Sequence, residues 1–226
     1  VLHLAVDFDG EPGRSSVGGV ALMTDDDSGG VLWVGADLLA RPEVGAALGG
    51  HPRLRMHRAK DAMRSLLPIG IDLRGLELDL AIAAYLVDPV VGDYEIPDLV
   101  ARFTDLTIGE RRAVPSGQLD LGGDDEDRAQ AAGDAALAVA RCAAPILAAV
   151  AEVGAASLLA EIETPLVRVL ARMEHLGIEV DVVRLREIGD RLRSEVEELA
   201  ARLREEAGHP DLNLNSPTQL RQLLYE

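Results

Sequence analysis

Short apolar runs separated by glycine- and aspartate-rich turns dominate the first third of the chain. Three of these runs predict the strands of an antiparallel meander: 2–8, 16–23 and 30–34. A further extended run predicts a strand over 54–57. Apolar residues spaced by three or four predict helices over 37–48, 61–67, 79–87 and 95–103. This order of strands and helices predicts an α/β domain with a central mixed sheet.

Helical periodicity dominates the rest of the chain. Residues 104–127 lose periodicity and predict a surface loop, whereas 128–153 predict a long, alanine-rich, buried helix. Gly154 interrupts the pattern after this helix. We therefore predict one domain at 1–155 and an all-α segment at 156–226.

The second segment begins with a helix that Gly177 ends, and a short apolar strand is predicted to lead into Asp181. A long helix over 181–208 follows. Its apolar residues form a single stripe with three- and four-residue spacing: Leu185, Ile188, Leu192, Val196, Leu199 and Leu203. Such a stripe is typical of a helix that packs on another helix along one face.

Composition and charge narrow the possible partners. The chain has 226 residues, of which 48% are hydrophobic and only 3% aromatic, so alanine, leucine and valine must fill its core. The net charge of -17 argues against nucleic acid wrapping the whole chain, because binding neutralises phosphates with Lys and Arg.

No apolar run of 18 residues and no leader pattern is present, so we expect a cytoplasmic protein with no membrane partner. Cys142 is expected to be a buried thiol, and the histidines lack zinc spacing.

Two stretches could carry chemistry. Asp7 and Asp9 lie two apart at the end of a predicted strand and therefore share one face, where two carboxylates could hold a divalent cation. A solvated strand end fits the same pair. Ser216 followed by Pro217 is a strong helix start, and exposed amides and hydroxyls there also suit phosphate oxygens.

The second segment resembles one family closely. Its order of helix, glycine break, apolar run, long helix and capped helix resembles the junction between the exonuclease-type and polymerase domains of bacterial family A DNA polymerases. The resembling residues are Pro165-Leu166, Met173-Glu174, Gly177 to Asp181, Asn213 to Leu220 and Leu223 to Glu226. The resemblance implies a ribonuclease-H-like first domain, as in proofreading exonucleases, followed by the start of a polymerase thumb.

The same resemblance implies a parent protein that is a DNA-directed DNA polymerase, a nucleotidyltransferase that works with Mg in replication and repair. The chain stops before anything resembling the palm and fingers motifs of that family. We therefore expect these 226 residues alone not to polymerise and to hold no cofactor. The start inside the first strand suggests that a further domain precedes Val1. The expected partners are a DNA primer-template and the palm and fingers of the same polypeptide.

In this family, the proofreading site binds two metal ions through an Asp-x-Glu pair and two further aspartates, and a tyrosine positions the attacking water. Asp7 and Asp9 match the pair, and Asp134 matches the fourth acid. Ala62 occupies the place of the third acid, with Asp61 one residue early, where it could instead cap its helix. Gln130 occupies the place of the tyrosine. The pattern predicts a vestigial exonuclease.

The matching asparagines and serine of these polymerases lie along the duplex backbone, so the resemblance implies that role for Asn213, Asn215, Ser216 and Thr218. Two other functions remain open. One is an active metal-dependent 3′→5′ exonuclease that uses the three matching aspartates and a shifted Asp61. The other is an acidic, non-catalytic scaffold whose helix at 181–208 pairs with a partner protein.

Overall fold

A computed structural model describes residues 1–25, 30–105 and 124–225. These residues form two compact units, Val1–Gly177 and Ile178–Glu226, and each unit is considered on its own. The predicted boundary at 155/156 falls inside the first unit, because the helix that ends at Gly177 packs on the α/β part of the chain.

The sheet of the first unit has five strands: β1 (Leu2–Phe8), β2 (Val17–Thr24), β3 (Val31–Gly35), β4 (Leu54–Met56) and β5 (Leu76–Asp79). Their order is β3-β2-β1-β4-β5. The first three strands form the predicted antiparallel meander, and β4 and β5 are parallel to β1. The predicted mixed sheet is therefore confirmed. Strand β5 was not predicted, because its four residues run directly into an apolar helix and share its pattern.

The helices of the first unit are α1 (Ala36–Leu39), α2 (Pro42–Gly50), α3 (Ala59–Leu66), α4 (Leu80–Val87), α5 (Ile96–Phe103), α6 (Asp124–Glu152), α7 (Ala156–Leu158) and α8 (Thr164–Leu176), with a 3₁₀ turn η1 (Leu67–Ile69) and a π-helical turn η2 (Leu159–Glu163). The helix predicted over 37–48 is two helices, because Pro42 starts a new one at its N1 position. Most of the predicted 104–127 loop lies outside the described residues, but α6 begins at Asp124, so the predicted loop extends too far.

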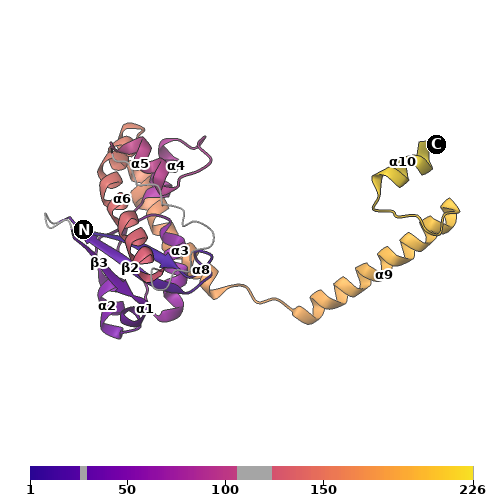
Figure 1. Cartoon of the computed structure of the whole chain (residues 1–226), viewed down its shortest axis with the longest axis horizontal. Helices are drawn as coiled ribbons and strands as arrows, with labels where there is room; N and C mark the ends of the chain where they lie inside the picture. The colour runs from indigo at the N-terminus through magenta and orange to yellow at the C-terminus, as the bar shows by residue number, and fades with distance from the viewer. Residues whose placement is uncertain (26–29, 106–123, 226) are drawn as a thin grey trace. The chain divides into compact units, whose positions relative to one another are not determined.

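Helix α6 packs against β1 and β2 mainly through its N-terminal half, and α4 and α5 pack against the same helix further toward its C-terminus (Figure 1). Small side chains such as Ala21, Ala132 and Ala136 are buried at the contact with β2. Cys142 of this helix is buried as predicted, and burial raises the pKa of its thiol to about 11. Residues 126–152 are long and apolar enough to cross a membrane by composition, and packing in the core accounts for that composition.

Asp79 connects two parts of the first unit from a buried position. Its carboxylate accepts hydrogen bonds from the backbone N–H groups of Arg58, Ala59 and Ala81, at 3.1, 2.7 and 3.0 Å. These contacts fix the start of α3, where Arg58 has a left-handed φ of 51°. Burial raises the pKa of Asp79. The suggested capping role of Asp61 is therefore wrong, because the acid that binds the start of α3 comes from β5.

The second unit contains α9 (Val182–Ala207) and α10 (Pro217–Tyr225). Asp181 caps α9 by accepting the N–H of Arg184 at 2.8 Å, and Gly208 ends α9 with a left-handed φ of 69°. The strand predicted before Asp181 is wrong. Residues 178–180 are irregular, and the described residues of this unit contain no strand with which they could pair. The predicted stripe of α9 is present, and no residue of α9 is buried.

The packing of α8 leads to a stability prediction. Ala171 is fully buried in the core below α8, whereas Val169 on the same helix is 51% exposed. Ala171→Glu would bury an unpaired charge, and we expect it to lower the free energy of unfolding of the first unit by at least about 3 kcal/mol. Val169→Glu should change it by no more than about 0.5 kcal/mol. Urea unfolding monitored at Trp33 in the sheet measures both, and equal effects would contradict the placement of α8 in this unit.

Candidate functional site

Asp7 and Asp9 lie at the carboxyl end of β1 and meet a side chain from α6. The Arg128 Nε donates a hydrogen bond to Asp7 Oδ2 at 2.7 Å, and its Nη2 donates to Asp9 Oδ1 at 2.6 Å. The same Nη2 also contacts Asp7 Oδ2. One guanidinium therefore lies between the two predicted carboxylates and neutralises part of their charge.

Two neighbours on β2 and its preceding loop complete this arrangement. The Ser16 Oγ donates to Asp9 Oδ2 at 2.6 Å. A Cβ atom at Gly18 would coincide with the guanidinium of Arg128 and with Asp7 Oδ2, so only glycine leaves room for the ion pair at that position. The Ser16 hydroxyl, followed by Arg128, holds the pKa of Asp9 below its usual range, and the two carboxylates raise the pKa of Arg128.

The other predicted exonuclease positions do not join this pair. Asp134 is exposed on α6, where its Oδ1 accepts a hydrogen bond from Gln130 Nε2 at 2.9 Å. Ala62 is buried and Asp61 lies against the loop at Gly13. Among the described residues, no three His, Cys, Asp or Glu side chains form a group that could hold a metal ion. The donor set of the family's two-metal site is therefore not assembled here.

The place where a third acid was expected adjoins a cavity lined by both apolar and charged side chains. Ala62 and Asp61 line a cavity of about 250 Å³, together with Leu4, Val6 and Phe8 from the other face of β1. Residues of a strand alternate between faces, so these three side chains point away from the face that carries Asp7. Two carboxylates, Asp61 and Glu95, also line this cavity, but Glu95 is paired with Arg58, and among the described residues no three ligand side chains form a group there.

The predicted nucleic-acid residues lie together before and within the first turn of α10. The N–H of Gln219 donates to Ser216 Oγ at 3.4 Å, which confirms Ser216 as the helix cap. The N–H of Asn215 donates to Asn213 Oδ1 at 3.0 Å, and the N–H of Asn213 donates to Gln219 Oε1 at 2.8 Å. Asn213, Asn215 and Thr218 are exposed, so side-chain N–H and O–H donors remain available to a ligand.

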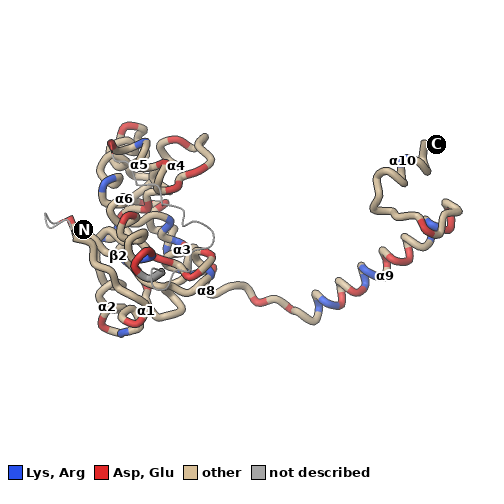
Figure 2. Tube along the Cα trace, viewed as in Figure 1, with Lys and Arg blue, Asp and Glu red and all other residues tan. Residues whose placement is uncertain are grey.

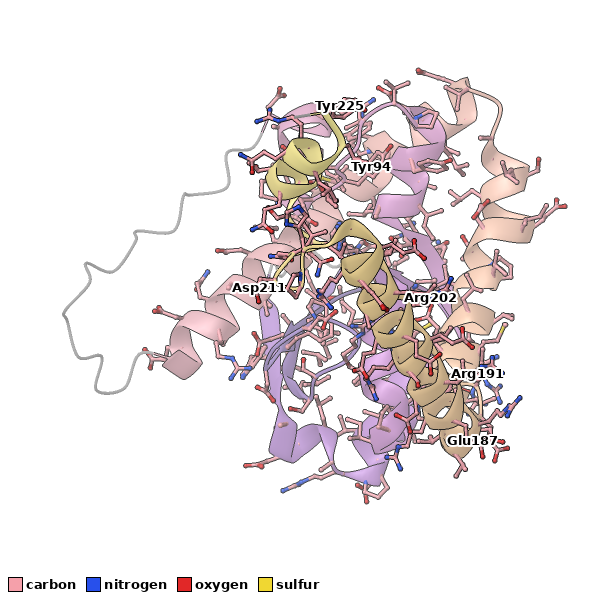
Figure 3. The ribbon with its side chains drawn as sticks, turned by 90° about the vertical axis from the view of Figure 1, so that its right-hand side faces the viewer. Tyr94, Glu187, Arg191, Arg202, Asp211 and Tyr225 are labelled. Atoms are coloured by element: carbon pink, nitrogen blue, oxygen red, sulfur yellow. The ribbon has the colours of Figure 1, made fainter. Side chains whose placement is uncertain are left out.

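Charges of both signs lie along α9 in the same unit. Figure 3 labels Glu187, Arg191 and Arg202 on α9 and Asp211 beyond its end, and the sticks show their side chains at the surface. Acidic and basic residues alternate along α9 in Figure 2. Exposed intrahelical pairs such as Arg193–Asp190, at 2.8 Å, account for part of this alternation. The helix therefore presents no continuous cationic surface.

Known proteins similar to this chain include the DNA polymerases I of Bacillus subtilis, Bacillus caldotenax and Mycobacterium tuberculosis. Their identities are 31%, 33% and 33%, over alignments that cover 74%, 83% and 91% of the chain. The same alignments cover 19%, 22% and 21% of the relatives, so the chain spans about a fifth of their length. No family model matches the chain.

Two solved structures extend the comparison. NrnC of Brucella melitensis has a TM-score of 0.63 at 13% identity, over 80% of this chain and 88% of that one, and this likeness concerns the fold alone. The first unit thus has the predicted ribonuclease-H-like fold. The POL domain of Pol1 from M. smegmatis, solved in complex with a DNA primer-template and dNTP, has a TM-score of 0.80 at 28% identity, over 99% of this chain and 37% of that one. The chain is thus similar to one segment of bacterial DNA polymerase I, the similarity that its motifs predicted.

Sequence reasoning missed the residues that hold the predicted ones in place. Arg128 was recognised only as the start of a helix, and Gly18 only as part of a strand. Arg128 follows four acidic residues at the start of α6, so its local sequence gave no signal for a partner on β1. The sequence does not specify which carboxylates it meets.

The Arg128 ion pair predicts a pH-dependent loss of stability in a variant. Because the pKa of Asp9 is lowered in the folded state, its pairing stabilises the fold above the ordinary carboxyl pKa, and this contribution is lost as the pH falls through the folded pKa. Arg128→Met should therefore lower the urea midpoint at pH 7, and the deficit should shrink below about pH 4. Asp134→Asn, which affects only an exposed contact with Gln130, serves as the control. A deficit that is independent of pH would contradict this account.

Proposed function

We propose that this chain is part of a DNA-directed DNA polymerase that acts in replication and repair, in the cytoplasm at the nucleoid. Its similarity to a segment of DNA polymerase I over most of its length supports this proposal. Polymerisation belongs to the palm and fingers of the parent polypeptide, with Mg as the metal cofactor. The 226 residues by themselves do not polymerise, and the described residues offer no ligand set for that metal.

The exonuclease-like unit is structural in this proposal. The observation that carries it is the guanidinium of Arg128 between Asp7 and Asp9, 2.7 and 2.6 Å from their oxygens. Two-metal hydrolysis requires such carboxylates to coordinate cations that activate water and stabilise the leaving oxygen. Here their charge is used to hold α6 on β1. Ala62 supplies no third carboxylate, and Gln130 supplies no phenol, so the remaining groups do not fit a two-metal site.

Digestion of a 5′-labelled single strand tests the structural role. In magnesium and then in manganese, we expect the wild-type chain and the Asp7→Ala, Asp9→Ala double variant to leave the strand equally intact. Arg128→Met, included in the same series, should be equally inert, since the third ligand and the tyrosine would still be missing. Stepwise shortening by the wild type that the double variant lacks would establish the alternative, an active 3′→5′ exonuclease.

The second unit carries the DNA contact in this proposal. Asn213, Asn215, Ser216 and Thr218 offer neutral donors around the start of α10, a geometry suited to phosphate oxygens. Such contacts position a duplex without reading its sequence. The net charge of the chain allows a local contact of this kind, since uncharged donors and a helix N-terminus provide it and a broad cationic face is not required.

Binding of a fluorescent primer-template tests these residues. Asn213→Ala with Asn215→Ala should weaken binding about tenfold, as expected for two lost hydrogen bonds. The slope of log affinity against log salt should stay unchanged, because neither change removes a cation. Ser194→Ala on the exposed surface of α9 is the control. Unchanged affinity in the double variant would refute the contact, and self-association of a wild type that binds no DNA would favour the acidic-scaffold alternative.

A further inference from the structure

Helix α8 is bound to the rest of the first unit at two charged points. At the first point, Arg168 donates two parallel hydrogen bonds to Asp72 in the loop after η1. The Arg168 Nε lies 2.9 Å from Asp72 Oδ1, and its Nη2 lies 2.5 Å from Oδ2. The two side chains are 32% and 29% exposed, so solvent screens this bidentate pair only in part.

The second point lies near the other end of α8, one and a half turns further along. Glu174 Oε1 lies 2.8 Å from Lys60 Nζ, and its Oε2 lies 2.8 Å from Arg64 Nη1. Lys60 and Arg64 are four residues apart and therefore lie on one face of α3. A single carboxylate of α8 thus bridges two consecutive turns of α3.

The apolar contact of α8 with the rest of the first unit is small. Of the thirteen residues of α8, only Thr164, Val167 and Ala171 are buried. The larger apolar side chains Val169, Met173 and Leu176 are 51%, 60% and 81% exposed. Because apolar stabilisation follows buried area, a valine and an alanine contribute little toward ordering a helix of this length.

We propose that the two ion-pair groups act as a latch that docks α8 on α3 and the loop after η1, and that acid opens it while the sheet stays folded. This inference rests on the proposed structural role of the first unit, since it names what the unit holds: the helix that leads toward the polymerase segment. When the ion pairs break, α8 would detach from α3 and from the loop after η1, while β1 and β2 stay folded.

The charges around each carboxylate set the direction of the pH effect. Asp72 faces Arg168 and Arg172 of α8 and Arg74 of its own loop, and these cations, Arg168 first, hold its pKa below the usual range.

Glu174 faces Lys60 and Arg64 of α3 and Arg14 of the loop after β1, and its pKa is likewise lowered, first by Lys60. A lowered folded pKa means that the stabilisation is complete above the unfolded pKa of each carboxyl and is lost as the pH falls through the folded value. The latch therefore opens on the acid side.

Hydrogen exchange of the whole chain, read by mass spectrometry at pH 7, tests the latch with neutral isosteres. In Asp72→Asn, Glu174→Gln we expect amides of 164–176 to exchange at least about tenfold faster, while those of β1 and β2 keep the wild-type rate. Glu187→Gln, Asp190→Asn removes two exposed ion pairs of α9 and should change neither segment. The charge-swapped pair Asp72→Arg, Arg168→Asp should restore most of the protection lost in Asp72→Asn.

Two results would overturn the latch: wild-type exchange of 164–176 in the double isostere, or faster exchange of 164–176 and the sheet together. A second comparison measures the protection factors of 164–176 in the wild type at pH 7 and at about pH 3, below the ordinary carboxyl pKa values. They should fall with acid in the wild type and stay nearly constant in the double isostere. The strand-digestion assay reads the proposed structural role separately, so nuclease activity and a failed latch cannot be confused.

Discussion

The guanidinium of Arg128 joins the two carboxylates at the end of β1 to the helix that covers that face of the sheet. Two like charges on one face of a strand repel each other unless a cation lies between them. In a metal-dependent nuclease, that cation is a pair of divalent ions, which also bind the substrate. Here the Arg128 side chain supplies the positive charge. Its nitrogen atoms lie 2.7 and 2.6 Å from oxygens of Asp7 and Asp9, and the lack of a side chain at Gly18 leaves room for it. The acidic pair then serves the packing of α6.

The position of the Arg128 guanidinium between Asp7 and Asp9 gives one physical reason for several features of the first unit. Arg128 neutralises part of the charge of Asp7 and Asp9, and Ala62, in the place where a third acid was expected, is buried beside a cavity. Gln130, in the place where a tyrosine was expected, donates a hydrogen bond to Asp134. These features agree with the structural role that we propose for the first unit. The retained fold still offers α3 and the loop after η1 as a surface for α8.

Local pattern was enough to predict the meander, the long α6 helix, the amphipathic α9 helix and the Ser216 cap, because turn residues, periodicity and capping are encoded over a few neighbouring positions. It failed where distant residues decide. The strand β5 is four residues of a run that continues into α4, and 178–180 has apolar residues but no neighbouring strand in its unit. Asp61 fits a cap by position, yet Asp79, eighteen residues on, takes that role through a fold-level contact.

The same limit applies to the site. Motifs led to the predictions for Asp7, Asp9, Ala62 and Gln130, whereas Arg128, Ser16 and Gly18 enter only once α6 lies on the sheet. The most direct test of the account is Mn²⁺ binding, measured by electron paramagnetic resonance on the wild type and on Asp7→Ala, Asp9→Ala. The account predicts identical spectra of free Mn²⁺ for both proteins. A bound-Mn²⁺ signal in the wild type that the double variant lacks would show that the carboxylates still serve a metal, and would contradict the assignment of their charge to Arg128.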